Sequence, residues 1–295
     1  MSATYQLFVG DCTAILESLT QTVDLTFLDP PFNQGKEYPN HNDNLPDAVY
    51  WEWMETICRE IYRLTSKGGA IYFMQREKNT EFVLRCLRNA GWTLQNLIIW
   101  KKLASAVPNI NKFGKHYQII AFATKGKKPR IFNRLRIDPP LPPNYRYERQ
   151  QGMYVTDVWD DIRELTSGYY AGEEPLRNPD GSRFHKQQSP VQLLLRILLS
   201  SSMPGDWVLD PFAGTGTTLI VARQLARNAI GIEKSEENAR CIRQRLESPR
   251  KADEVEVYFK EYRYTENLDQ IWGKYLELYS EDSQTFQLSL IPTDH

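Results

Sequence analysis

The chain has 295 residues, of which 41% are apolar and 25% charged, an ordinary balance for a soluble globular protein. This length suffices for one large domain or for one domain with an insertion. A net charge of −1 argues against bulk non-specific nucleic-acid binding, although it permits a local basic face. No run of about 18 apolar residues and no basic-then-apolar leader is present, so we expect a cytoplasmic protein.

The cysteines and histidines form no metal-binding or disulfide pattern. Cys12, Cys58, Cys86 and Cys241 are far apart in the sequence, and the four histidines form no H-x-x-x-H pair. We therefore predict neither a metal site nor a disulfide framework.

Short apolar runs rich in β-branched and aromatic residues alternate with longer amphipathic runs. In chain order, strands are predicted at 5–9, 23–28, 69–74, 93–100, 117–123, 206–209 and 229–233, and helices at about 47–65, 76–90, 189–202, 217–227 and 235–247. This alternation implies crossover connections and a mostly parallel sheet. The predicted fold is α/β and Rossmann-like, with seven strands and helices on both faces.

Residues 124–183 interrupt this rhythm, because they are rich in Pro, Tyr and Arg and have little periodicity. So long an irregular segment within a compact domain is functional or forms a small subdomain. Residues 248–295 form a C-terminal extension with one predicted strand at 255–259. The predicted units are therefore 1–123, 124–183, 184–247 and 248–295.

A glycine-containing turn joins a strand to a helix in the segment "VLDPFAGTGTTLIVARQLARNAIGIEK" (208–234). In open α/β sheets such a turn lies at the carboxyl edge, where ligands bind. Glu233 follows about 20 residues later, at the spacing from which an acidic side chain contacts ribose hydroxyls. No lysine follows the glycines, which favours a nucleoside without phosphates. The alternative is a structural turn and a surface glutamate.

Asp29-Pro30-Pro31-Phe32 also follows a strand and so is predicted at the same edge. The Asp29 carboxylate and the Pro30 carbonyl can accept both N–H groups of a planar amino group, which favours a nitrogen lone pair directed at an electrophile. The prolines fix the direction of that carbonyl, and Phe32 would stack on a base. The alternative is a rigid turn with a buried phenylalanine.

The order of these motifs resembles that of the S-adenosylmethionine-dependent DNA amino-methyltransferases of the permuted beta group. In that group the [DNS]-P-P-[YFW] motif comes first, a recognition region second, and the F-x-G-x-G loop last. This chain has DPPF at 29–32, the irregular segment at 124–183 and FAGTG at 212–216. "VGDC" (9–12), "KFGKHYQIIAFATK" (112–125) and "HKQQSPVQLLLRIL" (185–198) also resemble family segments.

The third of these segments resembles the H-P-T-Q-K-P helix start that borders the methionine moiety. It departs from that pattern, since Lys186 and Gln187 replace Pro-Thr and Ser189 replaces Lys. The resemblance implies S-adenosylmethionine as cofactor, bound by Asp11, Cys12, Asp29, Gln188, Ser189, Asp210, Phe212, Ala213, Gly214, Thr215, Gly216, Thr217, Thr218, Glu233 and Lys234. It also implies direct methyl transfer, without a metal, to a base flipped out of the duplex.

An aspartate in the first motif position is usually associated with adenine N6, so adenine is favoured and cytosine N4 is the alternative. A protein glutamine or RNA methyltransferase would use similar chemistry, and a non-catalytic DNA-binding subunit would retain the fold. The intact Asp29 and glycine loop favour an enzyme over such a subunit.

Double-stranded DNA is the predicted partner, which implies association with the nucleoid and, for this family, with restriction-modification systems. Its predicted contacts are Lys101, Lys102, Lys125, Lys127, Lys128, Arg130, Arg134, Arg136, Arg146 and Arg149. The alternative is a solvated basic loop. The polar stretch 33–46 is expected to be mobile without DNA and to close over the flipped base.

The tail segment 287–291 (QLSLI) resembles the short peptide that docks on the replication sliding clamp. Packing of this segment on its own domain is the favoured alternative. A homodimer is left open.

Overall fold

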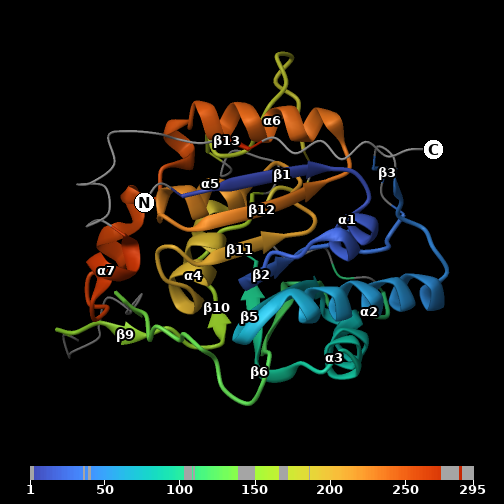
Figure 1. Cartoon of the computed structure of the whole chain (residues 1–295), viewed down its shortest axis with the longest axis horizontal. Coiled ribbons are helices and arrows are strands. Elements are labelled where there is room, and N and C mark those ends of the chain that lie inside the picture. The colour runs from blue at the N-terminus through green and yellow to red at the C-terminus, as the bar shows by residue number, and fades with distance from the viewer. Residues whose placement is uncertain are drawn as a thin grey trace.

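The computed structural model describes residues 3–35, 37–38, 41–102, 108, 110–138, 150–165, 172–185, 187–273 and 286–287. A nine-stranded sheet lies between two layers of helices (Figure 1). Its strands are β1 (Tyr5–Val9), β2 (Val23–Leu28), β5 (Thr65–Arg76), β6 (Thr93–Lys101), β7 (Tyr117–Thr124), β10 (Val158–Trp159), β11 (Trp207–Asp210), β12 (Asn228–Glu233) and β13 (Phe286–Gln287). They are arranged in the order β10-β6-β7-β5-β2-β11-β12-β1-β13.

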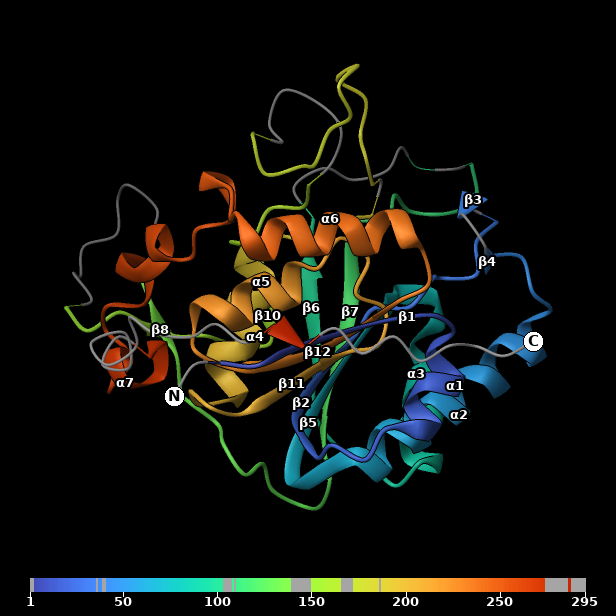
Figure 2. The same cartoon turned by 45° about the horizontal axis from the view of Figure 1, so that its top comes forward.

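Both faces of the sheet are covered by helices, as Figures 1 and 2 show. One face packs against α1 (Cys12–Ser18), α2 (Asp47–Leu64) and α3 (Thr80–Asn89); the other packs against α4 (Val191–Ser201), α5 (Thr217–Gln224) and α6 (Glu236–Glu247). The strands alternate accordingly. In β5, Ala70 and Tyr72 belong to the α4–α6 side of the core, and Ile71 and Phe73 belong to the α1–α3 side.

Smaller elements surround the sheet. They are the hairpins β3 (Glu37–Tyr38)–β4 (His41–Asn42) and β8 (Arg136–Ile137)–β9 (Met153–Tyr154), the short helix α7 (Leu268–Trp272), and 3-10 turns at Glu77–Asn79, Lys251–Asp253 and Glu256–Tyr262.

Strand direction decides which loops meet. β1, β12, β11, β2 and β5 pair in parallel, so their carboxyl ends lie at one edge of the sheet. β7 is antiparallel to both β5 and β6, and its carboxyl end therefore lies at the opposite, amino edge. The mostly parallel α/β fold predicted from the sequence is confirmed.

The seven predicted strands are all present, with bounds that differ by a few residues. The strand predicted at 255–259 is wrong, since a 3-10 helix occupies Glu256–Tyr262. A strand would place Val255 and Val257 on the same face, whereas Val255 is buried and Val257 is 62% exposed. Helix α1 and the strands β10 and β13 of the sheet are additional; all are short, and short elements give weak periodic patterns.

The turn from β11 into α5 is held by a buried carboxylate. Asp210 accepts hydrogen bonds from the Phe212 amide (3.1 Å) and from the Thr218 hydroxyl (2.5 Å). Gly216 then begins α5 in the left-handed region (φ 82°), and a Cβ there would lie 2.8 Å from Ile242. The glycine lets α5 and α6 approach, which fixes the loop between β11 and α5.

Asp210→Asn tests the cost of burying this carboxylate. Burial raises the pKa of Asp210 from its ordinary 3.8 to about 7. Between these values the folded protein retains a proton that the unfolded chain has released, so the unfolding free energy falls as the pH rises and stays low above pH 7. Asparagine has no such titration. In urea unfolding we expect the stability of D210N relative to wild type to rise by about 2–3 kcal/mol between pH 5 and pH 8. A pH-independent difference would contradict this assignment.

A second buried charge joins the segment after β10 to helix α4. The Arg196 side chain is 1% exposed. Its guanidinium donates to both carboxylate oxygens of Asp161, one of them at 2.8 Å, and to the Tyr262 hydroxyl at 3.2 Å. This ion pair fixes residues 158–162 against helix α4.

Asp161→Ala would remove this carboxylate and leave the buried Arg196 guanidinium without its ion-pair partner. We expect a loss of about 3 kcal/mol in the free energy of unfolding, measured by urea titration. The neighbouring Asp160 is exposed, and Asp160→Ala is the matched control, with an expected change within about 0.5 kcal/mol. Equal losses in the two variants would show that the ion pair contributes nothing specific.

Candidate functional site

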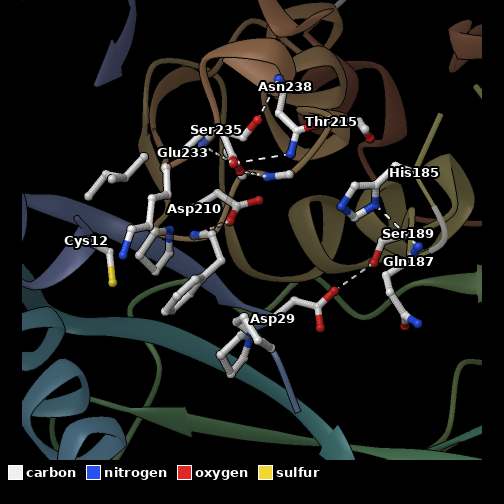
Figure 3. Close-up of a pocket in the computed structure, with 18 of the residues that line it drawn as sticks. Cys12, Asp29, His185, Gln187, Ser189, Asp210, Thr215, Glu233, Ser235 and Asn238 are labelled. Carbon is white, nitrogen blue, oxygen red and sulfur yellow. Dashed lines mark hydrogen bonds between the residues drawn. The ribbon is translucent and has the colours of Figure 1, made fainter. Parts of the chain in front are cut away.

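Five segments converge at the carboxyl edge of the sheet and enclose a cavity of about 650 Å³. They follow β1, β2, β11 and β12 and precede α4, and their lining residues lie within 10–12, 29–35, 183–189, 210–218 and 232–238. Figure 3 shows Glu233 and Asp29 on opposite sides of this cavity with Asp210 between them. The parallel pairing of the four strands brings together residues from Gly10 to Asn238, which are 228 positions apart in the sequence.

Glu233 is fixed at the end of β12. One carboxylate oxygen accepts from the Ser235 amide (2.8 Å) and from the Asn238 side chain (3.2 Å), and the other accepts from the Gly214 amide (2.8 Å). Burial raises its pKa. The predicted acid and the predicted glycine loop are thus in direct contact and form one wall.

The segment after β1 forms the adjoining wall. The Gly10 amide donates to the Glu233 carbonyl (3.0 Å), and Asp11 caps α1 by accepting from the Thr13 amide (3.0 Å). Lys234 Nζ lies 3.5 Å from an Asp11 oxygen. Cys12 is buried and lines the cavity. Its thiol pKa is raised to about 12, mainly by burial. This thiol is therefore uncharged at neutral pH.

The glycine loop is supported from outside by Arg245 of α6 and by the residues that follow this helix. The Thr215 carbonyl accepts from the Arg245 guanidinium, which is itself paired with the buried Asp253 carboxylate at 2.7 Å. Arg250 contacts the same carboxylate at 2.6 Å. The first residues of the C-terminal extension therefore hold the cavity wall in place.

Asp29 follows β2 and lies on the opposite side of the cavity from Glu233. Its Oδ2 accepts from the Ser189 hydroxyl at 3.1 Å, the contact drawn in Figure 3. The next turn is rigid: the Pro31 carbonyl accepts from the Tyr50 hydroxyl (2.7 Å), which in turn accepts from Gln75 (3.0 Å). Phe32 is 6% exposed and yet lines the cavity.

A second cavity, of about 800 Å³, begins where the first ends. Asp29, Phe32, Arg183, Gln187, Gln188 and Ser189 line both. Its other wall comes from Met74, Trp100, Lys102, Gln118, Glu164, Leu165 and Ser182. Asp29 therefore stands at the junction of two pockets.

Lys102 contributes a basic side chain to the second cavity wall, as Arg183 also does. Its Nζ lies 3.2 Å from the centre of the Trp100 ring. Burial lowers the pKa of Lys102 to about 7, although the carboxylates of Glu164 and Asp29 oppose this shift. Its charge therefore changes near neutral pH.

The segment before α4 is held by contacts of its own. Gln188 is buried and bonds backbone groups of Leu176 and Glu174 at 3.0 and 3.1 Å. Glu174 accepts from the Val191 amide (2.6 Å) at the start of α4, and burial raises the pKa of Glu174 to about 7. His185 lines the first cavity, where burial lowers its pKa.

Several lining residues are absent from the sequence-based prediction. Trp53 of α2 reaches the cavity, donates to the Thr13 hydroxyl (2.9 Å) and packs edge-on against Phe212 at 5.7 Å. Its spacing in α2 is that of an ordinary core position, so the sequence gives no signal. Arg183 and Asn238 were also missed, because each lies just outside a quoted motif: Arg183 precedes His185 by two residues, and Asn238 follows Lys234 by four and bonds Glu233.

The described members of the predicted DNA-contacting set lie in three different places. Lys101 and Lys102 lie at the carboxyl edge of the sheet, next to the second cavity. Residues 125–130 lie at the amino edge, because β7 runs antiparallel to its neighbours. There Lys125 Nζ donates to the Tyr62 and Thr65 carbonyls (both 2.8 Å), and Arg130 contacts Asp206. The expected basic patch beside the site is therefore divided between opposite edges.

The remaining members of that patch lie elsewhere. Arg134 and Arg136 stack on Tyr154, at 4.2 and 4.3 Å from its ring centre, beside the β8–β9 hairpin. Arg146 and Arg149 lie outside the described residues.

The loop predicted to close over a base has a fixed start and end. Asp43 accepts from the Asn33 and Gln34 amides at 2.8 and 3.1 Å, and Asn33 exchanges two hydrogen bonds with Leu45. Between them lies the β3–β4 hairpin. The mobility of this loop stays a prediction. In the tail, the backbone of Phe286–Gln287 pairs with β1, and residues 288–291 lie outside the described residues.

In the part of the chain that the structure describes, no cluster of three His, Cys, Asp or Glu residues is arranged to hold a metal ion. None of the described helices combines the length and the apolarity needed to cross a membrane.

Comparison with known proteins gives the same picture of the chain. Residues 23–244 match a family described as DNA methylase, of the N6 and N4 type. The chain is 32% identical over 259 residues to the DNA adenine methyltransferase YhdJ of Escherichia coli, with 81% of each protein covered. It is 30% identical over 245 residues to the type II methyltransferase M.HpaI of Haemophilus parainfluenzae, covering 82% of this chain and 74% of the relative.

Solved structures share the fold. The PvuII DNA methyltransferase, named as cytosine-N4-specific, matches with a TM-score of 0.61 at 17% identity and covers 94% of each chain. The M1.HpyAVI–SAM complex matches with a TM-score of 0.57 at 22% identity, covering 82% of this chain and 99% of that one. The family match over residues 23–244 and the two relatives at 30% and 32% identity confirm the predicted family. The chain belongs to the DNA methylases of the beta group, which transfer a methyl group from S-adenosylmethionine to an exocyclic amino group of a DNA base.

Proposed function

We propose that this protein methylates adenine N6 in double-stranded DNA at a specific site, with the base flipped into the second cavity. The observation that supports this most directly is the position of Asp29 at the junction of the two cavities. One cavity has room for the methyl donor and the other for the base, and the carboxylate faces both. An aspartate in this motif position and the 32% identity to a relative named as an adenine methyltransferase favour adenine over cytosine.

The first cavity has the chemistry that S-adenosylmethionine requires. Glu233 offers a fixed carboxylate to the ribose hydroxyls, and the walls near Cys12 and Phe212 offer apolar surface to the adenine ring. A Cβ at Gly214 would meet no atom closer than 3.8 Å, so this face of the loop is open to a ligand. Two buried polar atoms of the lining, Thr217 Oγ1 and Arg183 Nη2, find no hydrogen-bond partner among the described residues.

The second cavity has the chemistry that a flipped base requires. The Phe32 and Trp100 rings offer stacking surface, and Gln118, Lys102 and Glu164 add polar groups for the base edge. Unstacking a base costs a few kcal/mol, and stacking on an aromatic ring returns about 1–3 kcal/mol. A pocket with aromatic walls therefore offsets much of the cost of flipping.

S-adenosylmethionine supplies an electrophilic methyl group on its sulfonium. The Asp29 carboxylate accepts one N–H of the target amine, and the Pro30 carbonyl accepts the other. These contacts favour a nitrogen lone pair directed into the first cavity. The N–C bond would form as the S–CH3 bond of the sulfonium breaks, and S-adenosylhomocysteine would leave as a neutral thioether. The nitrogen would become positively charged, and the adjacent carboxylate would stabilise that charge and take up the proton that the nitrogen loses. The Ser189 hydroxyl keeps the carboxylate oriented while the pocket is empty.

The surface that faces DNA is proposed to lie at the carboxyl edge, around the segment between β6 and β7. Its described part, 110–116, presents Ile110 and Phe113, each 99% exposed, together with Lys112. Exposed apolar side chains beside basic residues suit insertion into a base stack with phosphate contacts at the sides. The amino-edge residues 125–130 lie at the other end of β7 from the cleft, so they are not part of this proposed surface.

Asp29→Asn tests the proposed chemistry. The amide keeps the size of the side chain but removes the negative charge that stabilises the methylated nitrogen. We expect the rate of methyl transfer from labelled S-adenosylmethionine to DNA to fall about 10²- to 10³-fold, with the cofactor Kd changed less than about threefold. Glu247 is exposed at the end of α6, and Glu247→Gln is the charge-matched control with an unchanged rate. Activity of D29N within tenfold of wild type would contradict the proposed role.

The base is identified by digesting the methylated DNA to nucleosides and separating them by mass spectrometry. We expect N6-methyladenine. N4-methylcytosine would overturn the choice of base and leave the rest of the mechanism intact, whereas label in protein or RNA alone would overturn the DNA substrate.

Two sets of variants test the position of the DNA surface. Phe113→Ala and Lys112→Ala at the carboxyl edge are expected to weaken DNA binding about 5- to 20-fold each, the loss of one stacking or phosphate contact. Lys127→Ala and Lys128→Ala at the amino edge are the matched controls, with an expected change below twofold. Fluorescence anisotropy with a labelled duplex at fixed salt measures both sets, and the reverse ranking would return the DNA surface to residues 125–136.

A further inference from the structure

One arginine lies where the two cavities meet and pairs with no carboxylate among the residues that the structure describes. Arg183 lines both cavities, beside Asp29 and Ser189. Its Nη1 donates to the Leu165 carbonyl, which fixes the side chain in place. Its Nη2 is buried and has no hydrogen-bond partner in the described parts of the chain.

This arrangement is unfavourable unless something completes it. A buried N–H without an acceptor costs on the order of 1–3 kcal/mol, and more on a charged group. The charged neighbour that acts on Arg183 is another cation, since burial and the charge of Arg177 lower its pKa. By contrast, the buried guanidinium groups of Arg196 and Arg245 each pair with an aspartate, and that of Arg227 bonds carbonyl and hydroxyl oxygens. Because Arg183 lines the cavity, its guanidinium is complementary to an anionic ligand bound there.

The position of Arg183 along the first cavity indicates which anionic group of a ligand it would bind. Glu233 marks the ribose end, and Asp29 marks the place to which the methyl group must be delivered (Figure 3). Beyond Asp29 the wall is formed by Ser189, Gln187 and Arg183. The part of the cofactor that extends beyond the sulfonium is its amino-acid arm, which ends in a carboxylate. Ser189 stands where the related motif has a lysine, so the cation expected from that motif is absent at this position.

We propose that Arg183 binds the α-carboxylate of S-adenosylmethionine through Nη2 and thereby replaces the motif lysine. This inference rests on the proposed function of the first cavity. A charge-assisted hydrogen bond to a carboxylate would satisfy the orphaned N–H, and the contact of Nη1 with Leu165 would transmit cofactor binding to the segment that also supplies Glu164 to the second cavity. Occupancy of the first cavity would then order a wall of the second.

Binding of a decarboxylated cofactor isolates this contact. Calorimetry with S-adenosylmethionine and with its decarboxylated analogue gives two Kd values for each protein. For wild type we expect the analogue to bind about 10- to 100-fold more weakly. For Arg183→Ala the affinity for S-adenosylmethionine should fall by a similar factor while that for the analogue stays within about threefold, so that the preference for the carboxylate is lost. Arg183→Lys, which retains the charge, should recover part of the preference.

Arg177→Ala is the matched control, because Arg177 is an exposed arginine paired with Arg183 in a β-bridge and lines neither cavity. It should keep the wild-type ratio of affinities. If R183A keeps that ratio, the carboxylate is bound elsewhere and the inference is overturned. If R183A instead weakens binding of cofactor-free protein to DNA with an unchanged ratio, the anion is a phosphate and the inference is likewise overturned. Should wild type bind neither ligand, the proposed function itself fails.

Discussion

Three neighbouring parallel strands, β2, β11 and β12, fix the carboxylates on which the cleft depends. Asp29 follows the last residue of β2, Asp210 ends β11, and Glu233 ends β12. Because side chains alternate between the faces of a sheet, a shift of one residue in either pairing would move a carboxylate to the wrong face. Apolar residues of both core layers set this register, since Leu209 packs on the α1–α3 side and Val208 on the α4–α6 side. The packing of the core therefore determines the geometry of the site.

Charged groups reinforce the site from outside. Asp253 joins Arg245 and Arg250, and Arg245 reaches the Thr215 carbonyl in the glycine loop. A buried ion pair adds little net stability, because desolvation offsets the attraction, but it requires one relative position of the two side chains. Here the ion pair positions the glycine loop: it connects residues after α6 to a loop that would otherwise be held by backbone contacts and by Glu233. The C-terminal extension is thus structurally part of the cleft at least as far as Asp253.

The parallel strands, the strand-end carboxylates and the family could be predicted from sequence because each depends on a local pattern. Asp29 and Glu233 follow apolar runs with turn residues, and this places both at the carboxyl edge of a parallel sheet. Arg183 and Trp53 could not be predicted, because their roles depend on contacts between distant segments. The location of Lys125 and Arg130 was misjudged for a related reason: sequence shows that β7 is a strand, but the direction in which it joins the sheet is decided by its partners β5 and β6.

Because β7 runs antiparallel to its neighbours, the turn that follows it lies at the edge of the sheet opposite the cleft. The eight residues of β7 span about 26 Å, so the turn at Gly126–Lys128 is roughly that far from the end of the strand that faces the cleft. This turn is exposed, and a Cβ at Gly126 would meet no atom within 4 Å. A fluorophore, an affinity handle or a fused targeting module attached there would stand clear of any duplex engaged at the other edge. The topology thus provides a place for engineering at the edge of the sheet opposite the cleft.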